Sequence, residues 1–288
     1  MSTTRPSGDG TYVSRSASLS VAGTASDDVG VTQVQWSNNR GGSGSATLGG
    51  SATAATWASA SVALSPGSNT VTISARDAAG NTGSSSIIVT YLPTYYVDAN
   101  AADDSGNGSL SRPKKYIGSG AALMSSSGGD TLIVKAGTYS NPLDAIGKLV
   151  SGKAGAWNII RAEVDGTVTI TAPLNIPLGD HYLQFEGLKW EGPTEKGING
   201  RFVKMLRCAF KDGPATGNTV VLGIGTSNAT PGAQYILVED SYVYGAGGRY
   251  KILVYNSDKV ILRRIVARHQ DGWSDTKGDP QAVVSLYN

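Results

Sequence analysis

The stretch from His181 to Asn288 repeats itself, and this repeat limits the possible folds more than any other feature. Four segments can be superimposed, each with alternating apolar residues, a two-residue interruption and renewed alternation. Alternation with a period of two indicates strands that bury one face. The first inward residues are 20, 33 and 24 residues apart, at Leu183, Val203, Ile236 and Val260. A return at such intervals predicts stacked coils of short parallel strands, a β-solenoid.

The same superposition predicts which side chains meet between coils. One interior column should contain Leu188, Cys208, Ser241 and Ile265. At the interruptions, the acidic pair 239–240 falls one coil before the basic pair 263–264. Because neighbouring strands lie about 4.8 Å apart, we expect these pairs to form a salt-bridge ladder on the surface.

Residues 12–91 show short alternating strands between turns rich in Gly, Asn, Asp and Ser, typical of a β-sandwich. The motifs ASDDVGV at 25–31 and ARDAAGNT at 75–82 resemble the bacterial immunoglobulin-like domains of secreted and surface proteins, over Ser18 to Tyr91. In that family a first strand precedes the segment that corresponds to PSGDGTYVS at residues 6–14 of this chain. In this sequence that first strand is missing or shortened. Either the domain is truncated, or a partner chain donates a strand to the open edge.

Residues 94–139 carry a second resemblance. The run YYVD at 95–98, a Gly/Asn/Asp-rich loop at 103–107, a weak helix at 117–124 and GDTLIVKAGTY at 129–139 resemble the opening of pectate-lyase-like right-handed parallel β-helix proteins. We therefore expect an all-β chain: an immunoglobulin-like β-sandwich at 1–92, then a right-handed parallel β-helix at 93–288. The short helix should cap its N-terminal end. No closing segment follows the last strand, so we expect the C-terminal end to be truncated or uncapped.

Charge and composition exclude several classes of function. Charged residues make up 16% of the chain and the net charge is +2, which argues against nucleic-acid binding. No apolar run approaches the roughly 20 residues that span a membrane. The single cysteine, Cys208, excludes a disulfide within the chain, and we expect it in the core. The two resemblances imply a secreted or surface-bound bacterial protein, although no signal peptide is visible in the sequence.

A cluster of basic and aromatic residues is the main candidate site. It follows a glycine-rich bend and continues one coil later, and such side chains suit an acidic glycan. The predicted glycan-binding residues are Tyr244, Arg249, Lys251, Arg268, His269 and Trp273. The β-helix resemblance implies that a catalytic site, if present, lies on an outer face. For lyase chemistry Lys251, Arg249 or His269 would serve as base or charge stabiliser. Glu186 and Glu191 lack the partner carboxylate that glycoside hydrolysis needs.

Two loops rich in oxygen ligands are candidate Ca²⁺ sites. One set is Asp27, Asp28, Asp77 and Asn81, and the other is Asp98, Asp103 and Asp104. Ordinary turns, in which Asp and Asn side chains bond their own backbone, also explain these residues, and this interpretation is favoured.

Two hypotheses about function follow. The first is an extracellular structural or adhesive protein that forms filaments or layers and binds glycans, or that self-associates through exposed β edges. The alternative is a polysaccharide lyase, or another carbohydrate-active β-helix enzyme, that acts on acidic glycans. The missing catalytic pattern favours the first.

Overall fold

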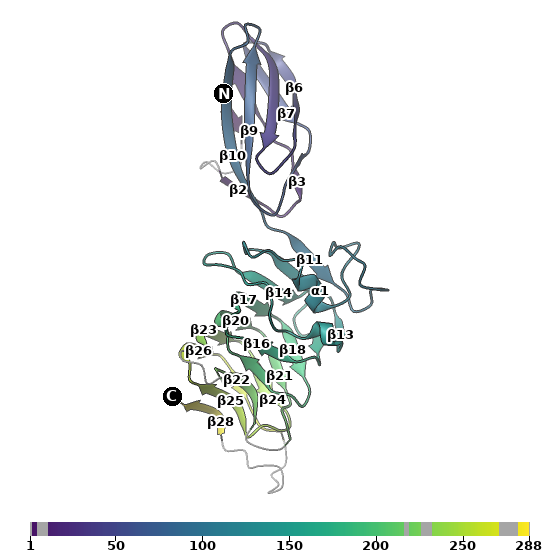
Figure 1. The fold of residues 1–288 in the computed structure, drawn as a ribbon, viewed down its shortest axis with the longest axis vertical. Helices are drawn as coiled ribbons and strands as arrows, with labels where there is room; N and C mark the ends of the chain where they lie inside the picture. Colours follow the sequence, from purple (N-terminus) through teal and green to yellow (C-terminus); the bar gives the residue numbers. More distant parts are fainter. Residues whose placement is uncertain (1, 5–10, 216–218, 226–231, 271–281, 288) are drawn as a thin grey trace. The chain divides into compact units, whose positions relative to one another are not determined.

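The structure is a computed structural model that describes residues 2–4, 11–215, 219–225, 232–270 and 282–287 (Figure 1). The chain separates into two compact units, Met1–Pro93 and Thr94–Asn288.

The first unit is a β-sandwich in which one strand belongs to both layers. The strand β6 (Ser43–Ser51) pairs with β5 (Val31–Asn38) through residues 43–45 and with β7 (Ala54–Ser59) through residues 46–51. Both layers contribute to one apolar core, which contains Trp36 and Trp57. Trp36 is therefore a core residue of the sandwich. The strand order is β1 (Ser2–Thr4), β4 (Ala22–Ser26), β7 (Ala54–Ser59), β6 (Ser43–Ser51), β5 (Val31–Asn38), β9 (Gly67–Asp77), β10 (Thr82–Tyr91) and β2 (Thr11–Ser14), with a separate pair, β3 (Ser18–Leu19) and β8 (Val62–Ala63).

A short strand does precede the segment PSGDGTYVS. β1 has three residues and pairs antiparallel with β4 at one edge of the sheet. After it, β2 pairs parallel with β10 at the other edge.

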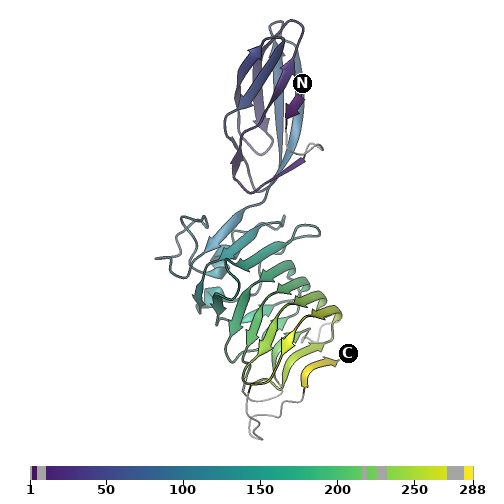
Figure 2. The same cartoon turned by 180° about the vertical axis from the view of Figure 1, so that it is seen from behind.

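The second unit is a parallel β-helix built from three sheets (Figures 1 and 2). All the strand pairs within these sheets are parallel, and successive strands of a sheet come from successive coils. The seven-stranded sheet contains β11 (Thr94–Val97), β12 (Thr131–Val134), β14 (Asn158–Ala162), β17 (His181–Glu186), β20 (Arg201–Leu206), β23 (Gln234–Glu239) and β26 (Asp258–Arg263). The six-stranded sheet contains β13 (Gly137–Tyr139), β15 (Val168–Ile170), β18 (Leu188–Glu191), β21 (Ala209–Lys211), β24 (Tyr242–Tyr244) and β27 (Val266–Ala267). The five-stranded sheet contains β16 (Leu174–Ile176), β19 (Lys196–Ile198), β22 (Val220–Ile224), β25 (Tyr250–Tyr255) and β28 (Ala282–Tyr287). The expected all-β class and the parallel β-helix are confirmed.

The predicted register between coils is also confirmed. Leu183 pairs with Val203, Val203 with Ile236, and Ile236 with Val260. In the second predicted column Leu188, Cys208 and Ser241 are buried and Ile265 is partly buried against the same core. The Ser241 hydroxyl accepts a hydrogen bond from the Cys208 amide at 3.0 Å, which satisfies a polar group inside this column.

A short helix, α1 (Ile117–Ala121), lies against the first coil. A Cβ atom at Gly120 would meet Val97 and Leu132, so the helix packs directly on β11 and β12. Asp144 holds the start of α1 by accepting from the Ile117 amide at 2.9 Å. It ends the 3₁₀ helix Pro142–Asp144. The helix ends before the predicted limit at residue 124, because turns lead into the run SSSGG.

Three rows of residues with left-handed backbone mark the corners between the sheets. The first row consists of the second residue of four strands in the seven-stranded sheet, Tyr182, Phe202, Tyr235 and Lys259; the second lies before the six-stranded sheet, at Gly187, Arg207, Asp240 and Arg264; and the third lies after it, at Gly192, Asp212 and Gly245. For a residue other than glycine this conformation costs about 1–2 kcal/mol. Interactions with neighbouring coils therefore have to stabilise this backbone conformation. Each of the three rows is stabilised by a different kind of interaction.

Candidate functional site

An aromatic row runs along the first set of corners. Tyr182 stacks on Phe202, and Phe202 stacks on Tyr235, with ring centroids 4.5 Å apart in both pairs. Trp157 contacts the edge of this row at 5.5 Å from Tyr182. Sequence reasoning missed this row, although the three stacked residues occupy the same place in the repeat, directly before the first inward residue.

The faces of these rings are already occupied. Lys259 closes one end of the row, with its Nζ 4.5 Å from the Tyr235 ring centroid and 2.8 Å from the Tyr235 hydroxyl. At the other end, the Nζ of Lys204 lies 4.2 Å from the centroid of the Trp157 ring. A sugar packs on an aromatic residue through the flat face of the ring. The aromatic row therefore supports the corner and does not offer a platform for a glycan.

Ion pairs hold the second set of corners, as the sequence predicts. Arg263 pairs with Glu239, and Arg264 pairs with both Glu239 and Asp240. The hydrogen bond from Arg264 lowers the pKa of the Asp240 carboxyl below its usual value. The ladder extends further back than predicted, because Arg207 pairs with Asp165 and Glu186 at 2.7 Å each. Glu186 is thus engaged in an ion pair.

The outer face of the six-stranded sheet gathers basic and tyrosine side chains from successive coils. Here it is called the tyrosine face, and it consists of Lys189, Glu191, Lys211, Tyr242, Tyr244 and Arg268. Tyr242 and Tyr244 project outward from β24, and 54% of Tyr242 is exposed. Lys211 pairs in register with Tyr244, and Lys189 lies one coil further back. The face is therefore open, aromatic and basic over four consecutive strands.

Charge on the tyrosine face is unbalanced toward the positive. Glu191 accepts from Lys211 and pairs with Lys189 at 2.9 Å. The hydrogen bond from Lys211, followed by that from Lys189, lowers the pKa of the Glu191 carboxyl, and Glu191 in turn raises the pKa of Lys211. Lys189, Lys211 and Arg268 stand against Glu191 and against Asp212, whose carboxylate lies 3.9 Å from the Nζ of Lys211. Among the described residues, three cations and two anions leave a net charge of +1 on and beside this face, which suits an anionic ligand.

The structure separates the predicted glycan-binding residues. Tyr244 and Arg268 lie on the tyrosine face, with the Arg268 amide bonded to the carbonyl of Val243 at 3.0 Å. Half-buried His269 follows Arg268. Arg249 lies beyond β24, 5.6 Å from the Tyr250 ring centroid. Trp273 lies outside the described residues.

Lys251 occupies a different position from the one expected. It is fully buried, and its Nζ donates to the carbonyls of Gly245 at 2.8 Å and Gly247 at 2.6 Å. In the paired strand β22, Val221 lies between the register partners of Tyr250 and Ile252 and is buried as well. In this arrangement the ammonium group of Lys251 reaches neither the surface nor a glycan on it.

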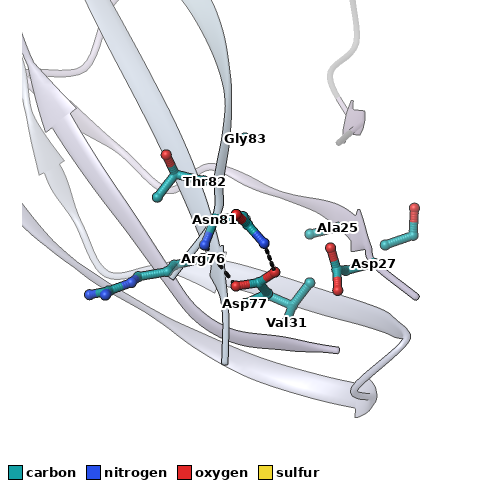
Figure 3. Close-up of a pocket in the computed structure, with 10 residues that line it drawn as sticks. Ala25, Asp27, Val31, Arg76, Asp77, Asn81, Thr82 and Gly83 are labelled. Carbon is teal, nitrogen blue, oxygen red and sulfur yellow. Dashed lines mark hydrogen bonds between the residues drawn. The ribbon is translucent and has the colours of Figure 1, made fainter. Parts of the chain in front are cut away.

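The first candidate Ca²⁺ set is brought together in part. Asp27, Asp77 and Asn81 line one cavity of about 200 Å³ in the sandwich (Figure 3). Both carboxylate oxygens of Asp77 accept from Asn81, at 2.7 and 2.8 Å, and this lowers the pKa of Asp77. Asp27 accepts from the amides of residues 29 and 30. Asp28 is not among the residues that line this cavity.

The second candidate set consists of turn residues. Asp98 accepts from the Asn100 amide at 2.9 Å and pairs with Lys135, and Asp103 accepts from the Ser105 amide at 2.8 Å. Asp104 accepts a hydrogen bond from the amide of Lys115 at 2.8 Å and so stabilises the segment directly before α1. In the described part of the chain, no three His, Cys, Asp or Glu side chains are placed to hold a metal ion together.

Two further predictions concern the core and the membrane. Burial raises the pKa of the Cys208 thiol to about 12, so the thiol stays protonated and unreactive at neutral pH. Among the described residues, no helix has the length and apolar character needed to cross a bilayer.

Comparison with known proteins does not identify a family for this chain. No protein-family model matches the chain, and no curated protein matches it. Among solved structures, a family 28 exopolygalacturonase of Yersinia enterocolitica matches with 10% sequence identity and a TM-score of 0.25, over 93% of this chain and 79% of that chain. The parallel β-helix is therefore established here by the strand registers, and not by this match.

Proposed function

We propose that this chain is part of an extracellular or surface-bound bacterial protein with a structural or adhesive role, and that it binds an acidic glycan along the tyrosine face. The β-sandwich, which resembles immunoglobulin-like domains in its motifs, serves as a spacer or adhesive module. The β-helix serves as a stiff shaft. The observation that carries the proposal is the alignment of two outward tyrosines with three basic residues on one open sheet face.

The geometry of the tyrosine face suits an extended chain of sugars. Strands of successive coils lie about 4.8 Å apart, so side chains from several coils can contact consecutive sugar units. Tyrosine offers a ring face for the apolar side of a sugar and a hydroxyl for its polar groups. Lysine and arginine pair with the carboxylates of uronic acids, and arginine does so with two parallel hydrogen bonds.

Binding fits this face better than catalysis does. The two glutamates closest to the candidate surfaces, Glu186 and Glu191, are both engaged in ion pairs with basic residues. Lys251, the leading candidate for a base, is bonded to backbone carbonyls in the interior. A lyase base has to reach the proton that it removes.

Affinity measurements on polysaccharides test the proposal. Polygalacturonate, alginate and chondroitin sulfate represent acidic glycans, and dextran is a neutral control. We expect binding to the acidic set alone, weakening as salt is added because the contacts are ionic. Tyr244→Ala and Arg268→Ala should each weaken binding about tenfold, a loss typical of a contact residue in an interface. Lys153→Ala, at an exposed residue away from this face, should not. Equal binding by Tyr244→Ala and the parent would refute the assignment of the site.

The alternative remains a polysaccharide lyase. Arg268 on the tyrosine face, with His269 next to it in the chain, favours it, since β-elimination needs a proton acceptor beside a group that neutralises the uronate carboxylate. Incubation with the same acidic polysaccharides distinguishes the two functions. Unsaturated uronic ends absorb ultraviolet light, and their release by the parent chain but not by His269→Ala would replace the binding proposal with an enzymatic one.

Two subsidiary proposals concern partners. The cavity lined by Asp27, Asp77 and Asn81 is the place in the sandwich where a Ca²⁺ ion would find oxygen ligands. Self-association through exposed β edges is the second, and mass measurement in solution over a range of concentrations tests it. A monomer at every concentration would remove it.

A further inference from the structure

Two lysines are buried in the β-helix and do not belong to the tyrosine face. Lys196 in β19 is 2% exposed and Lys251 in β25 is 0% exposed. By register Lys196 stands in an interior column, between Leu174 and Leu222 of the neighbouring strands. A buried ammonium group is costly unless hydrogen-bond acceptors surround it. The acceptors therefore indicate what these lysines do.

The acceptors are backbone carbonyls at the third set of corners. The Nζ of Lys196 donates to Gly192 at 2.6 Å, to Lys211 at 2.9 Å and to Asp212. The Nζ of Lys251 donates to Gly245 and Gly247, one coil further on. These are the corners at which β18, β21 and β24, the strands of the tyrosine face, come to an end.

The two corners are bonded to each other as well. The Asp212 amide donates to Tyr244 at 3.0 Å, and the Gly213 amide donates to Ala246 at 2.8 Å. In return the Ala246 amide donates to the Asp212 carboxylate at 2.7 Å. Residues 211–213 and 244–247 thus form one hydrogen-bonded block, with an ammonium group bonded to each half.

We propose that Lys196 and Lys251 are positioning residues for the tyrosine face, because their ammonium groups fix the corners from which Lys211 and Tyr244 project. The inference rests on the glycan-binding function proposed above. An ammonium group has three donors and no acceptor, so it can hold several carbonyls at one point. Such charge-assisted bonds are stronger than bonds between neutral groups, and they offset the left-handed backbone at Asp212.

Nearby charges keep Lys196 protonated at neutral pH. Burial lowers its pKa to about 8, while the carboxylates of Asp212 and Glu191 oppose this shift. Asp212 belongs to the block itself, and Glu191 belongs to the tyrosine face. The charge of Lys196 is therefore linked electrostatically to the face that its bonds position.

The test compares Lys196→Met and Lys251→Met with Lys153→Met, which removes an exposed lysine elsewhere. The readouts at pH 7 are amide exchange at Gly213 and Ala246, the ring NMR signals of Tyr244, and affinity for polygalacturonate, alginate and chondroitin sulfate. Both buried-lysine variants should exchange about tenfold faster at these two amides, a sign of local opening. The Tyr244 signals should shift while those of Tyr139 stay in place, and affinity should fall severalfold. Lys153→Met should leave all three readouts unchanged.

The outcomes separate this inference from the proposed function. Unchanged Tyr244 signals in a folded variant would overturn the positioning role. Faster exchange with unchanged affinity would overturn it too, and would leave glycan binding intact. If the parent binds none of the polysaccharides, the proposed function fails, and the Tyr244 signals alone decide whether the lysines position the face. Should Lys196→Met fail to fold, Lys251→Met decides the question.

Discussion

Phe202 lies in the middle of the aromatic row and shows how strain and stacking compete at one residue. Its φ angle is 51°, and its ring stacks on Tyr182 and Tyr235 at 4.5 Å each. Each stacked pair contributes about 0.5–1.5 kcal/mol. Phe202→Ala removes both stacked pairs and should therefore lower the free energy of unfolding by about 1–3 kcal/mol. Alanine at this position still has to adopt the strained left-handed backbone, so the substitution relieves no strain.

Phe202→Gly should be more stable than Phe202→Ala, the reverse of the usual order in strands. Glycine removes the left-handed strain of about 1–2 kcal/mol. It loses about 0.5–1 kcal/mol through the greater freedom of the unfolded chain. The net advantage of glycine over alanine is then about 0–1.5 kcal/mol, and about 0.75 kcal/mol at the midpoints of the two ranges.

Urea unfolding of the three proteins measures this order. The parent should be the most stable, followed by Phe202→Gly and then Phe202→Ala. The control is the same pair of substitutions at Lys204, two residues along β20, where φ is not positive and alanine should exceed glycine. If alanine is at least as stable as glycine at Phe202, then left-handed strain is not what the stacked rings offset.

Four further predictions follow from the same coordinates. Because the pKa of Lys196 is lower in the folded chain (about 8) than its ordinary value of 10.5, the unfolded state binds more protons between these values. The free energy of unfolding of the parent, relative to Lys196→Met, should therefore rise from pH 8 to pH 10 in urea titrations; a fall would contradict the burial of this charge. Arg264→Gln should lower the unfolding temperature more in low salt than at about 1 M salt, because salt screens its exposed pair with Asp240 more than its pair with the buried Glu239; an equal loss in both would show that the exposed pair contributes little. The Cys208 thiol should react with a thiol reagent only after denaturation, and fast labelling of the folded chain would contradict its burial. Ca²⁺ should raise the unfolding temperature of the parent but not of Asp77→Asn, and no rise in the parent would remove the Ca²⁺ proposal.

The repeat in the sequence was sufficient to predict the stacked parallel strands of the second unit. Period-two alternation and constant register are enough to place Leu183, Val203 and Ile236 in one column, because a slip of one residue would expose the whole inner face. The ion pairs of Arg263 and Arg264 follow from the same register, since opposite charges fell at equivalent positions in adjacent coils.

The sequence was less informative in strands where the alternation of apolar and polar residues does not indicate which side chains are exposed. Lys251 lies in the run RYKILVYN, where alternation predicts an outward side chain. In β22 and β25, however, most residues are buried on both faces of the sheet, so an outward position is also an interior one. Phe202 and Tyr235 look like ordinary outward residues in the sequence, because the left-handed backbone that stacks them is a property of the corner.

The three rows of corners differ in what acts on them. Salt weakens ion pairs, alkaline pH discharges a buried amine without lowering the stability of the fold, and neither acts strongly on stacked rings. A change of medium that acts on one edge of this three-sided shaft leaves the other two unchanged. A stack built in this way should keep its length and direction in surroundings as different as seawater and an alkaline soil.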